Sequence, residues 1–372
     1  MRVLAGLQTH VGTLGRPLFG SEFRPATSVT AQPRPRECKT PAAARSDAVD
    51  VVRLLAATAV VLLHSLRSTE TVGWSSLLRF AVPFYLFASL YFLARSLERR
   101  PGWTLRSLTA SRLRRLYVPF AAWSVIYFAL RNVKRIVVLR SGPPDMGVSL
   151  AWTGAQYHLW FLPFLLTTTI LLGLILRAIG DGERRHRRCR IAIGLALLAG
   201  LTLSAIPVGS FWTESFDQSG YTYSHWLAAA PAACGAIAFA LYASVLAPAT
   251  TIPPVIGFAG IILTVSCCAN EALSGDRVRL VPRALAGFGA MLAALAPWNG
   301  PIVAALARLG RYSFGVYLTH VLFVESLHVG LAKCHVAPGA AADLLVFAAS
   351  FAGSLCLTRL ITRSSRLVWL VA

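Results

Sequence analysis

Long apolar segments separated by short polar loops run along most of this chain. About ten of them are long enough to cross a bilayer core, which takes roughly 20 apolar residues in a helix. They lie at residues 48–66, 77–97, 116–133, 158–179, 191–209, 225–247, 252–270, 282–298, 311–329 and 343–362. The pattern predicts an all-α, polytopic integral membrane protein with about ten transmembrane helices.

Arginine falls mainly into alternate loops, which predicts the orientation of the chain. The loops at 95–115 and 177–190 are crowded with arginine, whereas the loops on the opposite side of the predicted membrane are mostly neutral or acidic. Because positive charge gathers in cytoplasmic loops, we expect both termini to be cytoplasmic. The basic stretch from Arg131 to Arg140 falls on the outer side, either as a tolerated exception at the interface or as a surface for an anionic acceptor.

Composition supports the same class. Of 372 residues, 56% are hydrophobic and only 14% are charged, which is well below the charged fraction of soluble domains. The formal net charge of +21 could indicate nucleic acid, but its confinement to particular loops follows membrane insertion, and we expect no nucleic-acid partner. The seven cysteines have no Cys-x-x-Cys spacing, so we expect neither a metal site nor a disulfide framework.

The first 45 residues differ from the rest, being rich in Pro, Arg, Ala and Thr. Their apolar stretches are too short for the core of a signal peptide. We expect residues 1–45 to be a basic, disordered cytoplasmic tail, or in part an over-extended start of the reading frame. Residues 46–366 then form one transmembrane domain, followed by a short C-terminal tail at 367–372.

The first apolar segment contains a charged and a titratable residue, Arg53 and His64. They are eleven residues apart, which at about 100° and 1.5 Å per residue puts both on one helix face, roughly 16 Å apart. Such groups cost free energy in hydrocarbon, so their presence is by default a hypothesis of function. The alternative is a snorkelling arginine and a histidine bonded to a neighbouring helix. In the predicted topology Arg53 lies towards the cytoplasm and His64 towards the outer half of the membrane.

Three further segments place polar groups at membrane depth. Tyr157, His158 and Trp160 lie at the outer start of the fourth span and could also belong to an aromatic belt at the interface. The ninth span carries Ser313, Tyr317, His320 and Glu325, and His320 could also be a packing residue. The third span begins with the arginines Arg112, Arg114 and Arg115, which could also be simple positive-inside anchors.

Taken together, these segments resemble the acyltransferase 3 family of integral membrane acyltransferases, which includes acetylases of O-antigen, exopolysaccharide and Nod factor. The family's first helix has an arginine and a histidine with ten residues between them, matched by Arg53 and His64. Its second helix typically reads Val-Pro-Phe-Phe-Phe-x-x-Ser-Gly, which Val82-Pro-Phe-Tyr-Leu-Phe-Ala-Ser89 resembles, whereas Leu90 replaces the glycine. His158-Leu-Trp-Phe-Leu and Ser313-x-Gly-x-Tyr-x-x-His320 also resemble family motifs.

The resemblance implies transfer of an acetyl group from cytoplasmic acetyl-CoA to a hydroxyl of a bacterial surface polysaccharide or its lipid-linked repeat unit. An exopolysaccharide is the favoured acceptor and lipopolysaccharide O-antigen the second. No cofactor would be bound permanently. The chain would be a multi-pass protein of the bacterial inner membrane, in contact with the lipid bilayer and with polysaccharide-assembly machinery as a further candidate partner.

Specific roles follow from this chemistry. A sugar hydroxyl is a poor nucleophile, so His64 is expected to be either the general base or an acyl-accepting relay. Arg53 would hold the polar arm of the donor, with Asp50 one turn below it. Arg114 and Arg115 are candidates for the CoA phosphates, because arginine matches phosphate oxygens with two donors. The residues His158, Trp160, Tyr317, His320 and Glu325 are expected to bind the acceptor or to support the catalytic imidazole.

Two other functions are compatible with a many-helix chain. A transporter or flippase of a lipid-linked glycan would also carry intramembrane charges, but the Arg53-to-His64 segment has no repeat in the second half of the chain. An inactive scaffold of a polysaccharide-assembly complex is the other alternative. A scaffold without activity would have no need of the arginine and the histidines, so their presence weighs against this alternative.

Overall fold

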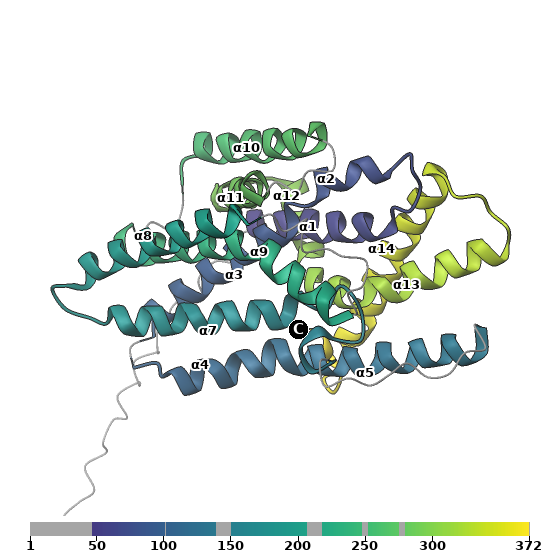
Figure 1. Ribbon diagram of the computed structural model, residues 1–372, viewed down its shortest axis with the longest axis horizontal. Helices are drawn as coiled ribbons and strands as arrows, with labels where there is room; N and C mark the ends of the chain where they lie inside the picture. Colours follow the sequence, from purple (N-terminus) through teal and green to yellow (C-terminus); the bar gives the residue numbers. More distant parts are fainter. Residues whose placement is uncertain are drawn as a thin grey trace, which may run out of the picture. The chain divides into compact units, whose positions relative to one another are not determined.

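The computed structural model describes residues 47–100, 102–138, 150–206, 218–247, 252–274 and 280–371, and these contain helices and no strand. Residues 45–372 form one compact unit. The predicted tail at 1–45 lies outside the described residues. The α-helices of Figure 1 are α1 Asp47–Ser65, α2 Ser75–Leu78, α3 Ala81–Glu98, α4 Leu105–Arg112, α5 Val118–Val133, α6 Leu150–Thr153, α7 Phe161–Ile179, α8 Arg185–Ser204, α9 Gln218–Leu241, α10 Pro254–Leu273, α11 Leu280–Leu295, α12 Pro301–Gly310, α13 Ser313–Lys333 and α14 Ala340–Arg363.

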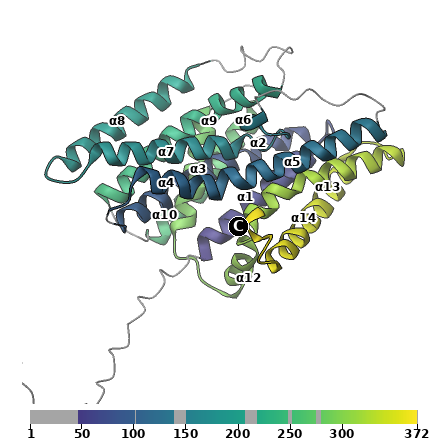
Figure 2. The ribbon, with the colours of Figure 1, turned by 90° about the horizontal axis from the view of Figure 1, so that it is seen from below.

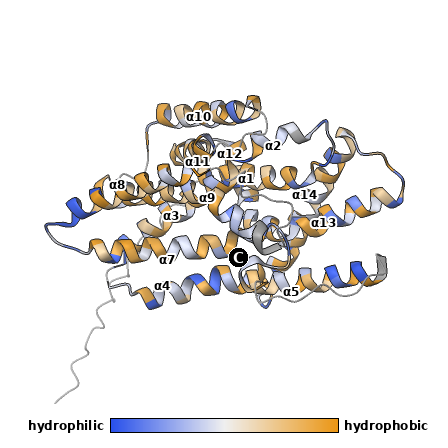
Figure 3. Ribbon diagram, in the orientation of Figure 1, coloured by the Kyte–Doolittle hydropathy of each residue, from blue (hydrophilic) through white to orange (hydrophobic). Residues whose placement is uncertain are grey.

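The all-α, polytopic membrane class is confirmed. Among the described residues, eight helices are long and apolar enough to cross a membrane, at residues 47–65, 75–98, 105–136, 161–179, 222–246, 254–273, 313–333 and 340–363. The other two expected spans are also helical. However, α8 begins with Arg185, Arg187, Arg188 and Arg190, and α11 has only 16 residues. Figure 3 shows apolar residues along most helices and polar residues at helix ends such as the start of α8.

Helix α1 carries Arg53 and His64 and lies against α3, α11, α12, α13 and α14. Small residues allow this crowding, since Ala56, Ala57 and Ala59 are 0%, 1% and 4% exposed. Close van der Waals packing of this kind is the main attraction between helices in lipid. At Gly310, the last residue of α12, a Cβ would lie 1.9 Å from the backbone oxygen of Asp50.

The helix that contains α4 and α5 is interrupted by a π-helical stretch, Leu113–Tyr117. Here the amide of Val118 donates to the carbonyl of Leu113, five residues earlier. Pro119, the second residue of α5, has no N–H to continue the regular ladder. Single wide turns of this type often occur at functional sites.

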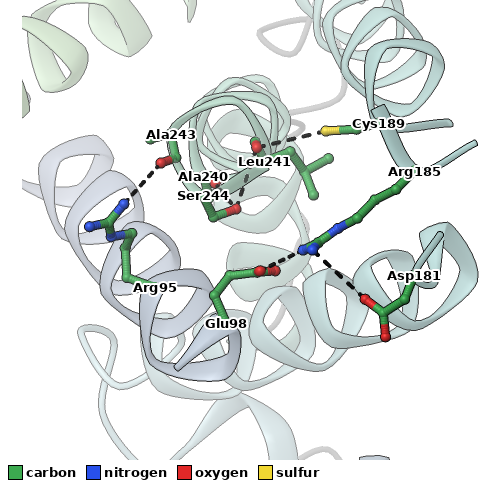
Figure 4. Close-up of polar contacts among 9 residues, drawn as sticks. All are labelled: Arg95, Glu98, Asp181, Arg185, Cys189, Ala240, Leu241, Ala243 and Ser244. Carbon is green, nitrogen blue, oxygen red and sulfur yellow. Dashed lines mark hydrogen bonds and ion pairs between the residues drawn. The ribbon is translucent and has the colours of Figure 1, made fainter. Parts of the chain in front are cut away.

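Helices far apart in the chain are joined at the end of the bundle that contains the start of α8. Arg185 of α8 pairs with Glu98 of α3 at 2.5 Å and with Asp181 at 3.7 Å (Figure 4). Arg95 donates to the carbonyl of Ala243, 3.3 Å away, in the π-helical stretch that follows α9. The two arginine-rich loops predicted on one side of the membrane therefore lie at one end of the bundle. Their orientation towards the cytoplasm stays a prediction.

The C-terminal residues pack against α5. The indole Nε1 of Trp123 donates to the carbonyl of Leu370 at 3.0 Å, and Val371 is 4% exposed. The stretch predicted as a short tail at 367–372 thus holds a short helical turn, Val368–Leu370, against the bundle. Figure 2 shows α5 running alongside α13, in agreement with the 2.7 Å bond from Tyr127 to the carbonyl of Leu318.

Candidate active site

A pocket of about 250 Å³ lies beside the Arg53 end of α1. Four arginines line it, and they come from three parts of the chain. Arg53 comes from α1, Arg112 and Arg115 from the π-helical junction of α4 and α5, and Arg311 from the junction of α12 and α13. The wide turn and the close approach of α12 to α1 therefore bring these guanidinium groups to one cavity.

The pocket carries an excess of positive charge. Arg53 pairs with the buried carboxylate of Asp50 at 3.4 Å. Within the described residues, Arg112, Arg115 and Arg311 form no ion pair. A cavity with one carboxylate beside four guanidinium groups attracts anions, and guanidinium groups bind phosphate oxygens with two donors.

Aromatic side chains also line the pocket. Tyr85 of α3, Phe161 of α7 and Tyr317 of α13 line it. The hydroxyl of Tyr85 donates to the backbone carbonyl of Arg53 at 2.9 Å. A lining with both cationic and aromatic side chains suits a molecule that has a phosphate-bearing part and a less polar part.

Three histidines meet on the other side of Tyr317, and we call them the histidine cluster: His64, His158 and His320. The ring centroids of His64 and His320 are 5.3 Å apart with the rings stacked at 25°. Those of His158 and His320 are 5.0 Å apart, edge to face. The Tyr317 ring lies 5.5 Å from that of His158, so one tyrosine borders both the pocket and the cluster.

The segment that carries His158 is a tight turn between α6 and α7. Gly154 has a φ of +76°, and a Cβ there would lie 2.8 Å from the Cβ of Leu159. A side chain at position 154 would be strained as well as crowded. The turn holds Tyr157 with its ring 5.0 Å from the ring of His64.

Hydrogen bonds hold the cluster in place. The hydroxyl of Tyr317 donates to the backbone carbonyl of His158, and Nδ1 of His320 lies 2.7 Å from the carbonyl oxygen of Tyr317. His158 and His320 are 3% and 0% exposed, while His64 is half-buried. Both ring nitrogens of His158 and Nε2 of His320 have no hydrogen-bond partner among the described residues.

The remaining residues predicted for the site lie away from the cluster. Trp160 contacts His225 of α9, with ring centroids 5.2 Å apart. Glu325 pairs with Arg67 at 2.9 Å and with Lys134 at 3.3 Å, and these pairs join the ends of α1, α5 and α13. Arg114 is exposed and does not line the pocket. In the part of the chain that the structure describes, no group of His, Cys, Asp and Glu could hold a metal ion.

Sequence reasoning did not assign Arg112, Arg311 or Tyr85 to the site. A signal for Arg112 was available, because residues three apart share a helix face and Arg112 and Arg115 have that spacing. Arg114 falls on another face. Arg311 follows a glycine at a helix junction, and nothing local in the sequence places that junction beside Arg53.

Comparisons with known proteins give one family and one relative. A family model described as an acyltransferase domain matches residues 46–363. A curated protein named as an amino-acid racemase, from Enterococcus faecalis, is 26% identical over 189 residues, which is 48% of this chain. The matched stretch is 27% of that protein, so the chain spans only about a quarter of its length. No solved structure matches the chain.

Proposed function

Because the chain belongs to the acyltransferase 3 family of membrane acyltransferases, we propose that it transfers an acetyl group from cytoplasmic acetyl-CoA to a hydroxyl of a bacterial surface polysaccharide. The acceptor is the polysaccharide or its lipid-linked repeat unit, with an exopolysaccharide favoured and lipopolysaccharide O-antigen second. The protein would work in the bacterial inner membrane with both termini in the cytoplasm, beside the machinery that assembles the polysaccharide.

One observation supports this proposal most strongly: the cationic pocket and the histidine cluster share Tyr317 as a common border. A donor with phosphates at one end and a thioester at the other needs both environments in sequence. Arg53, Arg112, Arg115 and Arg311 would bind the phosphates. The thioester end would then extend along the aromatic side chains of the lining towards the histidines.

The histidines supply the chemistry that a sugar hydroxyl lacks. The hydroxyl needs a base to remove its proton as its oxygen bonds to the acyl carbon. His64 would act as this base, or would accept the acyl group and pass it on. Asp50, paired with Arg53, would hold that guanidinium group in position. In the predicted orientation the donor enters from the cytoplasm and the acceptor from the opposite side.

The test is the acetyl content of surface glycans, measured by proton NMR in a deletion strain of the source cell. The strain is complemented with the wild type or with His64→Ala, and the membrane abundance of both proteins is compared. We expect acetyl groups to return only with the wild type. Unchanged acetylation with reduced glycan export would instead support a transporter or flippase of a lipid-linked glycan.

A further inference from the structure

The imidazole of His320 has a defined tautomer. Its Nδ1 lies 2.7 Å from the carbonyl oxygen of Tyr317, three residues earlier on α13. A carbonyl oxygen only accepts hydrogen bonds, so Nδ1 carries the ring proton. In the neutral ring, Nε2 therefore presents a lone pair.

No described residue donates to this lone pair. His320 is 0% exposed, and its Nε2 has no hydrogen-bond partner within the described part of the chain. The hydroxyls of Tyr127 and Tyr317 are engaged elsewhere, since Tyr127 donates to the carbonyl of Leu318 and Tyr317 to that of His158. A buried acceptor without a donor is unfavourable. The position suits a donor that arrives from outside the protein.

The surroundings of His320 indicate which donor that is. The ring of His64 stacks on one side, with centroids 5.3 Å apart, and His158 lies at 5.0 Å. A hydroxyl bonded to Nε2 would thus lie beside His64, within the same cluster. A hydroxyl donates one proton and becomes a nucleophile when that proton is removed.

We propose that His320 is the base of the transfer, an assignment that rests on the proposed function. Its Nε2 takes the proton of the acceptor hydroxyl as that oxygen bonds to the acyl carbon. His64 then takes the second of the two roles considered for it and accepts the acyl group from acetyl-CoA.

The two steps balance. In the first, a nitrogen of His64 bonds to the acyl carbon of acetyl-CoA, the C–S bond breaks, and the ring proton of His64 leaves with the CoA sulfur. In the second, the hydroxyl oxygen bonds to the acyl carbon and the C–N bond to His64 breaks. The proton taken up by His320 then returns to the freed nitrogen of His64. His320 thereby regains its starting state, and His64 is neutral again with its proton on the nitrogen that carried the acyl group, so a tautomer exchange of His64 precedes the next turnover.

The experiment uses membranes that contain the full chain and acetyl-CoA labelled in its acetyl group. The acceptor is the surface polysaccharide of the source cell after mild alkaline removal of its acetyl groups. Without polysaccharide, the wild type should hold label on His64, located by peptide mass spectrometry, and added polysaccharide should release it. This measurement needs no variant to fold.

Substitutions then distinguish the role of His320 from that of His64. His320→Gln and His320→Asn keep a polar group but no base, so both should acquire label on His64 and transfer it about 100-fold more slowly or worse. His328→Gln, on the same helix, is the matched control and should transfer like the wild type. Thermal stability of each variant is measured alongside.

Two results would overturn the assignment while leaving the acyltransferase intact: transfer by the wild type with no label on His64 when polysaccharide is absent, or transfer by His320→Gln at the wild-type rate. Failure of the proposed function looks different. In that case the wild type would neither release CoA nor label the polysaccharide.

Discussion

Two arginine-bearing regions of the bundle differ in what balances their charge. In the region of Figure 4, Arg185 is paired with Glu98 and Asp181, and Arg95 donates to a backbone carbonyl. In the pocket, only Arg53 of the four lining arginines is paired with a carboxylate, that of Asp50, among the described residues. Balanced charge joins helices, whereas surplus charge converging on a cavity marks a binding site for an anion.

The largest effect is expected when positive charge is removed from the pocket, which tests whether the unpaired arginines bind an anion. Arg112→Gln with Arg115→Gln should lower kcat/KM for acetyl-CoA by at least about 100-fold, because each lost charge-assisted hydrogen bond is worth about 1.5–3 kcal/mol. The thermal midpoint should stay near that of the wild type. CoA release from membrane vesicles at varied acetyl-CoA measures the effect. An unaltered dependence on the donor would show that both arginines are only membrane anchors.

The converse change is to remove a carboxylate that pairs with an arginine in the region of Figure 4. Glu98→Gln should lower the free energy of unfolding by about 1 kcal/mol or less, as expected for a partly exposed ion pair. The apparent KM for acetyl-CoA should not change, because neither Glu98 nor Arg185 lines the pocket. Thermal unfolding in detergent and the same CoA-release assay measure the two quantities. A raised KM with unchanged stability would contradict the division between the regions.

The smallest effect is expected at Arg114, between two pocket arginines in the sequence. Because its side chain is exposed and absent from the pocket lining, Arg114→Gln should raise the KM for acetyl-CoA by no more than about threefold, through the loss of long-range attraction alone. This attraction should weaken with added salt. An effect as large as that of the double variant would mean that Arg114 contacts the donor directly.

The spans could be predicted from the sequence because the bilayer sets a local rule on length and polarity. That Arg53 and His64 share one helix face could also be predicted from the local sequence, because it follows from helical geometry. The convergence of His158 and His320 on His64 depends on how three elements pack. Only the resemblance to a family suggested that they act together.

What could not be predicted depends on contacts between distant segments. The spacing of Arg112 and Arg115 indicates a shared helix face, but a regular helix count around Pro119 does not reveal the π-helical stretch in which the helix widens. Arg311 enters the pocket because α12 lies against α1. Glu325 was expected near the imidazoles, but its pairing with Arg67 and Lys134 depends on where α1 and α5 end.

The contact between Gly310 and the backbone of Asp50 has a consequence for genetic screens. A methyl group at position 310 would collide with main-chain atoms that no rotamer change can move. Even Gly310→Ala would push α12 from α1 and separate Arg311 from Arg53. A saturation screen would therefore rank this glycine with the histidines, although it contributes to the reaction only by having no side chain.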